Sequence, residues 1–278
     1  MTSDALARDV AGMPGRGAAR NLYRRAMREG TFSPEDEGLG EAACTAWRMR
    51  FDVPLLKVTR TVDEVGHDGR PTTKAVLRTE DGFEVEAVRI PMGRDRTTLC
   101  VSSQVGCRLA CAFCETGKMG LVRSLRPEEI VAQVVTVHAQ LGWPVRKLVF
   151  MGMGEPLDNA EAVIQALRVF NDPRGFSLSQ SNLTICTAGH VEGLAKLASL
   201  GWGRLNLSVS LNAATDAKRD KLMPINRRVP LAALQDALIR YRPSDRFIFA
   251  VNYCLMPGFN DAPEDLEAVA RFCAPLGR

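Results

Sequence analysis

The sequence contains no apolar run long enough to cross a membrane, and its first residues, MTSDALARDV, lack the apolar core of a secretory signal peptide. We therefore expect a cytoplasmic protein. Aromatic residues are scarce, at 6% of the 278 residues, so the sequence does not indicate a broad platform for stacking nucleic-acid bases. Histidine is scarcer still. His67, His138 and His190 show no spacing typical of metal ligands, and we predict structural or exposed roles for all three.

Charge of one sign is not in large excess. The 36 basic and 32 acidic residues give a net charge of +4. Such mild basicity is compatible with nucleic-acid binding but is equally common in other globular proteins, so it excludes neither. The length allows a full core, of a size for one barrel-like domain and a small extension.

Cysteine, by contrast, is concentrated in one stretch, CVSSQVGCRLACAFCETGKMG from position 100 to 120. Cys107, Cys111 and Cys114 follow a C-x3-C-x2-C spacing, and no further cysteine occurs before Cys186. A structural zinc site normally gathers four ligands. Three thiolates can instead hold a four-iron cluster and leave one iron open, which suits a catalytic centre. The alternative, buried or disulfide-bonded cysteine, is common in small secreted chains, and this chain shows no secretory context.

The N-terminal part is predicted to be helical. Residues 1–20 are expected to fray, Ala19–Glu29 and Ala42–Phe51 are predicted helices, and Ser33 is a predicted helix cap before Pro34. A group of arginines crowds this region, and it indicates either a solvated helix face or an RNA contact. Its members are Arg20, Arg24, Arg25, Arg28, Arg48 and Arg50.

From residue 55 the periodicity changes to that of strands. Leu55–Val62, Lys74–Arg78 and Glu84–Ile90 alternate in hydrophobicity and are separated by turns at 67–71 and 80–82, which predicts a β-meander. Thr98–Ser103 is the first predicted core strand, and it leads into the cysteine loop at its C-terminal end.

Strands and helices then alternate, which predicts an α/β fold with a parallel sheet and right-handed crossovers. The motifs lie at the C-terminal ends of the strands, where barrel active sites are found. Further strands are predicted at Arg146–Met151, Asn182–Thr187, Asn206–Leu211 and Phe247–Tyr253, and helices at Pro127–Leu141, Ala160–Phe170, Val191–Leu200, Ala217–Leu222, Leu231–Arg240 and Pro263–Cys273.

A glycine-rich loop, MGMGEP at 151–156, follows the second core strand. Gly152 and Gly154 would let the backbone approach a ligand closely, and Glu155 would accept hydrogen bonds from a cationic group. A tight turn explains such a loop equally well by itself. Its place one strand–helix unit after the cysteine loop favours a ligand site.

Four sequence words together carry a resemblance. CVSSQVGC at 100–107, FMGMGEP at 150–156, SVSLNA at 208–213 and RDKLMPIN at 219–226 resemble, in that order, the RlmN/Cfr family of radical S-adenosylmethionine (SAM) RNA adenine methyltransferases. The resemblance implies a partial (βα)6 radical SAM barrel over 97–278, preceded by a helical extension over 1–54 and the β-meander over 55–96. It also implies a [4Fe-4S] cluster and SAM as cofactors.

The resemblance also implies roles for single residues. Gly154 and Glu155 match positions that contact the methionine end of SAM. Cys100 matches a cysteine that pairs, in a disulfide that releases product, with a later cysteine that carries a methyl group; a small buried apolar residue is the alternative. Glu86 matches a proton acceptor, although a glutamate on a strand is more often solvated. Further implied SAM contacts are Cys186, where the family commonly has serine, Ser210 and Leu211, and Asn212 in place of a histidine.

As a whole, the resemblance implies methylation of C2 of adenosine in 23S rRNA through a methylcysteine, with tRNA as a further candidate substrate. The alternatives are C8 methylation of the Cfr type, or a truncated inactive relative that binds a cluster or RNA. A monomer reduced by an electron donor such as flavodoxin is expected. The family's sixth barrel strand and methyl-carrying cysteine would lie beyond Arg278, so we expect a fragment that binds a cluster without methylating RNA by itself.

Overall fold

The computed structural model describes residues 1–66, 69–93, 96–242, 244 and 247–277, so His67 and part of the turn predicted at 67–71 lie outside the described residues. The chain forms two compact units. The first comprises Met1–Val101, Arg126–Leu148 and Gln165–Ser179, and the second comprises Ser102–Leu125, Val149–Ile164 and Gln180–Arg278. The division predicted at residues 54 and 96 stays a prediction.

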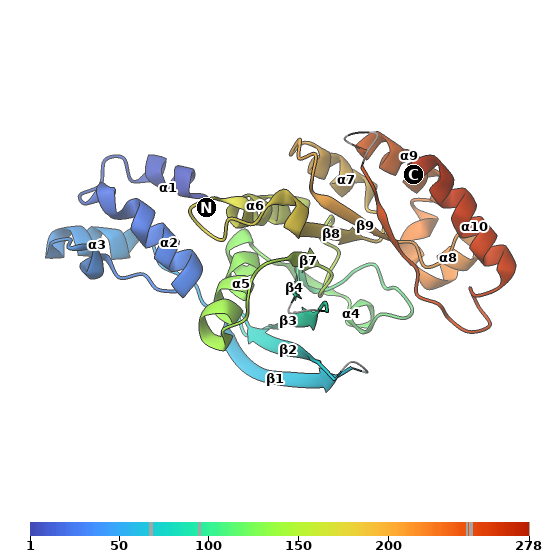
Figure 1. The fold of residues 1–278 in the computed structure, drawn as a ribbon, viewed down its shortest axis with the longest axis horizontal. Coiled ribbons are helices and arrows are strands. Elements are labelled where there is room, and N and C mark those ends of the chain that lie inside the picture. The colour runs from blue at the N-terminus through green and yellow to red at the C-terminus, as the bar shows by residue number, and fades with distance from the viewer. Residues whose placement is uncertain (67–68, 94–95, 243, 245–246, 278) are drawn as a thin grey trace. The chain divides into compact units, whose positions relative to one another are not determined.

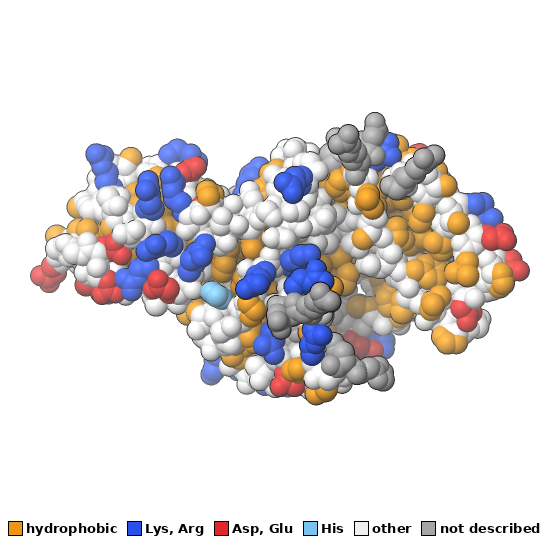
Figure 2. Space-filling view, viewed as in Figure 1, with side chains coloured by type: hydrophobic (Ala, Val, Ile, Leu, Met, Phe, Trp, Pro, Cys, Tyr) orange, Lys and Arg blue, Asp and Glu red, His pale blue; other side chains and the backbone are white. Residues whose placement is uncertain are grey.

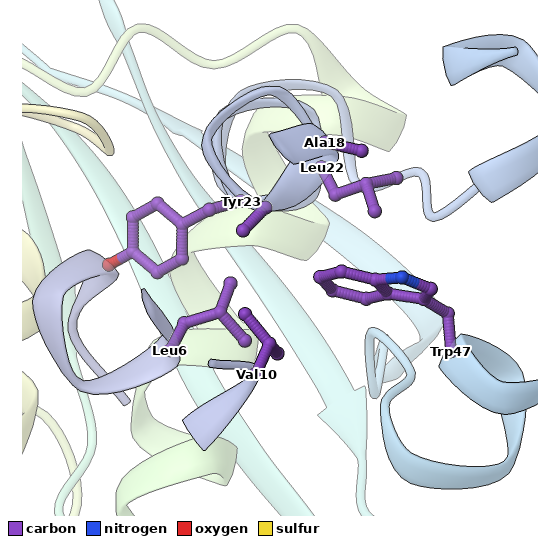
Figure 3. Packing of buried hydrophobic residues seen from close by; sticks show 7 residues of the cluster. Leu6, Val10, Ala18, Leu22, Tyr23 and Trp47 are labelled. Carbon is purple, nitrogen blue, oxygen red and sulfur yellow. The ribbon is translucent and has the colours of Figure 1, made fainter. Parts of the chain in front are cut away.

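Three helices fold together at the start of the first unit: α1 (Ser3–Asp9), α2 (Ala19–Glu29) and α3 (Glu41–Arg50). The prediction that residues 1–20 fray is wrong. Leu6 and Val10 lie about one helical turn apart, so both face the same side and pack against Leu22 and Trp47 (Figure 3). The indole nitrogen of Trp47 donates to the carbonyl of Pro14 at 2.9 Å, which satisfies its buried polar group.

Two 3-10 turns flank α2. One precedes it at Arg16–Ala18, and the other, at Pro34–Glu37, lies between α2 and α3. Ser33 occupies the predicted N-cap position before Pro34, but its side chain makes no capping hydrogen bond, and the element that follows is a 3-10 turn. The predicted end of α2 is confirmed, since Gly30 adopts a positive φ of 67° just after it.

The predicted β-meander forms β1 (Lys57–Val65), β2 (Pro71–Arg78) and β3 (Glu84–Pro91). The strand predicted as the first core strand, β4 (Thr97–Val101), continues this run and pairs antiparallel with β3. Strands β1 to β3 lie side by side in Figure 1. Glu86 pairs with Val76 on β2, and Cys100 pairs with Val88 on β3. Helix α5 (Pro127–Leu141) has the predicted bounds and belongs to the same unit.

The second unit begins with a hairpin that the sequence did not predict. Strands β5 (Gln104–Gly106) and β6 (Leu121–Ser124) pair antiparallel, and the short helix α4 (Glu115–Lys118) lies between them. Gly106 has a φ of 77°, and a Cβ there would lie 1.9 Å from the carbonyl oxygen of Gly120. Glycine is therefore required where the hairpin closes the cysteine loop.

The parallel strands are β7 (Leu148–Phe150), β8 (Leu183–Thr187), β9 (Asn206–Ser210) and β10 (Ala250–Asn252), in that order. Their parallel pairing from β8 to β10 confirms the predicted α/β class. The connecting and following helices are α6 (Ala160–Asn171), α7 (Val191–Ala198), α8 (Asp216–Leu222), α9 (Leu231–Tyr241) and α10 (Pro263–Cys273).

The last strand differs most from its prediction. Strand β10 covers three residues of the predicted 247–253, and Cys254 beyond it is exposed. Among the described residues β10 pairs on one side, with β9, so hydrogen bonds do not close the sheet into a barrel. Within the described part of the chain, no helix is long and apolar enough to cross a membrane.

Candidate active site

The cysteine loop lies between β5 and α4 in the second unit. Cys107 is buried, whereas Cys111 and Cys114 are half-buried. Backbone hydrogen bonds hold the loop at three points: Cys107 N donates to Gly120 O, Cys114 N to Cys111 O, and Ala112 N to Leu222 O, at 2.8 to 3.0 Å. The first two bonds keep the loop folded, and the third anchors it to α8.

The thiols of the cysteine loop lie in surroundings that disfavour their charged form. Burial raises the pKa of the Cys107 thiol and raises the pKa of Cys111 to about 12, and the neighbouring thiols add to the shift in Cys111. Thiolates in this place therefore need a bound cation to balance them, and soft thiolate donors suit iron–sulfur clusters and zinc. In the present side-chain positions, no group of three Cys, His, Asp or Glu in the described parts of the chain has the geometry of a metal site.

The glycine-rich loop follows β7 and packs against the start of the hairpin. Gly154 has a φ of 98°, and a Cβ there would lie 2.6 Å from the Cβ of Gln104. The side-chain oxygen of Gln104 accepts a 2.9 Å hydrogen bond from Glu155 N. The close approach that the sequence predicted at Gly154 is thus made to the protein's own hairpin.

Glu155 is a buried carboxylate, 3% exposed. Its oxygens accept hydrogen bonds from Leu157 N at 3.0 Å and from Ala188 N at 2.8 Å, so it joins the ends of β7 and β8. Burial raises its pKa to about 7 despite these bonds. Glu155 makes no ion pair with any described residue, and an uncompensated buried acid fits a cationic ligand.

The other predicted SAM contacts lie on β8 and β9. Cys186 is buried on β8, and Ser210 ends β9, followed by the buried Leu211. Asn212 is buried with a φ of 56°, and its side-chain oxygen accepts from Cys254 N at 3.0 Å. Asn212 therefore holds the segment after β10, and its predicted contact with SAM stays a prediction.

Glu86 and Cys100 belong to the first unit, unlike the other predicted site residues. Cys100 is buried on β4. The Glu86 carboxylate, with its side chain 37% exposed, forms an ion pair of 2.9 Å with Lys74. This is the environment of a partly solvated strand residue, and the predicted catalytic roles of both residues stay predictions.

Two charged residues of the site were not predicted. Asp158 accepts hydrogen bonds from the Gln104 side chain at 2.8 Å and from Arg108 Nε at 2.9 Å, so it holds both sides of Cys107. It also faces His190 Nε2 at 3.5 Å. His190 has the predicted structural role, since its Nδ1 accepts from Gly193 N at 3.1 Å and caps α7. A cavity of about 400 Å³ is lined by Arg108, Asp158, His190 and residues of 224–229.

The second unpredicted residue is Arg219 at the start of the RDKLMPIN word, and it is 1% exposed. Its guanidinium donates to the carbonyls of Ala188 and Leu211, at 2.6 and 3.1 Å. Arg219 lies inside one of the quoted words and Asp158 lies two residues after another. A charged residue type alone, however, indicates neither the burial of Arg219 nor the contacts of Asp158.

Three comparisons relate the chain to known proteins. The model of the radical SAM superfamily matches residues 101–273. The chain is 47% identical over 209 residues to a probable RNA methyltransferase, sce1580, of Sorangium cellulosum, covering 74% of this chain and 52% of that protein. It is 45% identical over 265 residues to the dual-specificity RNA methyltransferase RlmN of Geobacter sulfurreducens, covering 93% and 69%.

A solved structure of a radical SAM methyltransferase is also similar to this chain. The crystal structure of a radical SAM methyltransferase from Sphaerobacter thermophilus matches with a TM-score of 0.86 and 35% identity, over 98% of this chain and 80% of that one. The chain spans 52% and 64% of the lengths of two curated relatives, the Sorangium protein and an RlmN of Geotalea uraniireducens.

Proposed function

Because the chain belongs to the radical SAM superfamily and, within it, to the RlmN/Cfr family of RNA methyltransferases, we propose that it takes part in transferring a methyl group to RNA with a [4Fe-4S] cluster and SAM. The observation that carries this proposal is the position of the cysteine loop within the same unit as the buried Glu155. Gln104 and Asp158 link the two loops.

Cys107, Cys111 and Cys114 would hold three irons of the cluster and leave the fourth for SAM. When bound, the cluster and SAM supply the radical chemistry that an unreactive aromatic carbon requires. The protein's own part is to keep the loop in place through Asp158 and to exclude water around Glu155.

Glu155 would face the cationic amino group of SAM. Its raised pKa of about 7 reflects burial without a cation, so a bound ammonium would favour the ionised form. Gly154, Cys186, Ser210, Leu211 and Asn212 are the further proposed contacts. They are supported by their places at the C-terminal ends of the strands.

RNA would bind the first unit through a stripe of arginines on and before α2. Arg16, Arg20, Arg24 and Arg28 are spaced four residues apart, and Arg174 joins them in lining two hollows of about 580 and 420 Å³. Figure 2 shows basic side chains gathered over this helical region. Like charges at this spacing cost helix stability, so a polyanionic partner is a physical reason to keep them.

We propose C2 of adenosine in 23S rRNA as the target, with tRNA as a second substrate and C8 as the competing position. Cys100 would form the disulfide that releases product, and Glu86 would accept a proton. The proposal also includes a flavodoxin-like electron donor, a monomer and a cytoplasmic location.

The test is an anaerobic assay of the full-length gene product with methyl-labelled SAM, a reductant and 23S rRNA fragments, followed by nucleoside mass spectrometry. We expect label on adenosine at C2 with the wild type and none with Cys107→Ala. The matched control is Cys44→Ala, since Cys44 is a buried cysteine of α3 in the first unit. Label at C8 would correct the position, and equal labelling with Cys107→Ala would contradict the proposal.

A further inference from the structure

Arg219 is a fully buried cation whose hydrogen-bond partners are all neutral. Nη2 donates to the carbonyls of Ala188 and Ser210 at 2.6 and 3.3 Å, Nε donates to Leu211 O at 3.1 Å, and Nη1 donates to the side-chain oxygen of Asn226 at 2.9 Å. These bonds satisfy the donors, but they do not balance the charge. A buried charge is costly unless something of opposite sign lies near it.

Two aspartates lie near Arg219, but the Asn226 side chain stands between them and the guanidinium. The Asn226 side-chain nitrogen donates to Asp216 at 2.9 Å and to Asp220 at 2.8 Å, and neither aspartate forms an ion pair with Arg219 among the described residues. Asp216 is exposed and Asp220 is half-buried, so water screens both. Burial lowers the pKa of Arg219 to about 10, which still leaves it charged at neutral pH.

The cysteine loop packs beside residues that Arg219 contacts. Leu109 and Cys111 pack against an apolar cluster that contains Ala188, the residue whose carbonyl Arg219 binds. The loop is tied to the same place by the bond from Ala112 N to Leu222 O. Arg219 and the Cys111 sulfur therefore lie close enough to interact electrostatically.

We propose that Arg219 is the counter-charge of the iron–sulfur cluster and raises its reduction potential. This inference rests on the cluster proposed at the three cysteines. Adding an electron makes the cluster more negative, and a fixed cation in a water-poor setting stabilises that reduced form. An exposed arginine has little such effect because water screens it. The competing explanation is that the guanidinium only satisfies backbone carbonyls.

The test is a potentiometric titration of the reconstituted full-length protein, followed by EPR, with iron content measured first. Arg219→Gln should shift the equilibrium towards the oxidised cluster by about tenfold, which is about 59 mV for one electron. Arg219→Lys keeps the charge but not the planar guanidinium. Its equilibrium between oxidised and reduced cluster should stay within about threefold of that of the wild type. The matched control is Arg227→Gln, which removes an exposed cation of the next turn and should cause no shift.

The outcomes separate this inference from the function it rests on. Wild-type protein without a four-iron cluster would overturn the proposed function itself. A normal cluster in Arg219→Gln with an unshifted potential would overturn the inference alone, as would equal shifts in the Gln and Lys variants. If Arg219→Gln loses the cluster while Arg219→Lys keeps it, the charge is what the cluster needs. If both variants lose the cluster, the hydrogen-bonding geometry of the guanidinium matters instead of its charge, and the inference is wrong.

Discussion

Glu155 and Arg219 show how burial sets the chemistry of single residues in this site. Glu155 accepts two backbone hydrogen bonds and still has a pKa raised to about 7, because desolvation outweighs them. Arg219 satisfies its donors with carbonyls and one amide, and its pKa falls to about 10 for the same reason. The buried Glu155 therefore fits a cationic partner, and the buried Arg219 fits an anionic one.

The raised pKa of Glu155 predicts a pH dependence of stability. Between its ordinary pKa of 4.5 and about 7, the folded state binds more protons at this group than the unfolded state, so its contribution to the free energy of unfolding falls as pH rises through that window. Urea unfolding of Glu155→Gln should show a loss of about 1–3 kcal/mol at pH 5, because one backbone N–H loses its acceptor. The difference in the free energy of unfolding between the variant and the wild type should be smaller at pH 8 than at pH 5.

The matched control for this experiment is Glu161→Gln. Glu161 is exposed, and its ion pair with Lys196 at 2.7 Å lowers its pKa, so the variant should track the wild type above pH 5. A constant gap between Glu155→Gln and the wild type from pH 5 to 8 would mean that Glu155 does not titrate in this window.

The same carboxylate predicts an effect on SAM binding. Glu155→Ala would remove the charged hydrogen bond that we propose to the amino group of SAM, which should cost about 1.5–3 kcal/mol, or roughly ten- to a hundredfold in affinity. The measurement is the SAM concentration that perturbs the EPR spectrum of the reduced cluster. Unchanged affinity would place the SAM amino group away from Glu155.

At the scale of elements, Asp158 joins parts of the second unit that are far apart in the chain. It follows the glycine-rich loop, and it holds Gln104 of the β5–β6 hairpin, Arg108 of the cysteine loop, and His190 at the start of α7. A single carboxylate thus couples the position of Cys107 to two neighbouring strand–helix connections.

Asp158→Ala should therefore loosen the cysteine loop without unfolding the protein. The buried amide of Gln104 and the Arg108 cation would lose their shared partner, at a cost of about 1–3 kcal/mol. Hydrogen exchange of residues 107–120 in the cluster-free protein should speed up, and iron in the reconstituted protein should leave faster to a chelator. Glu161→Gln serves again as the control; equal exchange and iron loss in both variants would contradict the coupling.

At the scale of the whole molecule, the arginine stripe of the first unit is the feature that a macromolecular substrate would use. Arg20 and Arg24 make no hydrogen bond or ion pair with any described residue, whereas the adjacent Arg25 pairs with Asp36 at 2.8 Å and Glu29 at 3.2 Å. The same helix therefore carries both neutralised and available cations.

Replacing both Arg20 and Arg24 by glutamine should weaken RNA binding and flatten its salt dependence. Each lost phosphate contact should reduce the slope of log K against log salt by about 0.7–0.9. The measurement is fluorescence anisotropy with an rRNA fragment at several salt concentrations. Arg25→Gln is the control and should leave the slope unchanged. A double variant with the wild-type slope would remove this surface from the RNA-binding site.

Local sequence signals determined several elements by themselves. The bounds of α2, α5 and α10 were predicted correctly because proline or glycine marks their ends, and such stop signals act within a few residues. Helix α1 was missed, since Leu6 and Val10 become informative only through the partners they pack on. The β5–β6 hairpin was missed because strands of three and four residues are too short to show alternation.

The features of the active site also fall into those that local sequence determines and those that depend on the tertiary structure. The sequence alone determined the cysteine spacing, the glycine-rich loop and the order of the words that identify the family, because each is a run of neighbouring residues. Only the tertiary structure decided that Glu155 and Arg219 are buried, that Asp158 holds Arg108, and that Asn212 binds Cys254 N. Desolvation and hydrogen bonding depend on groups brought together from 30 to 50 or more positions away, and no local pattern encodes that environment.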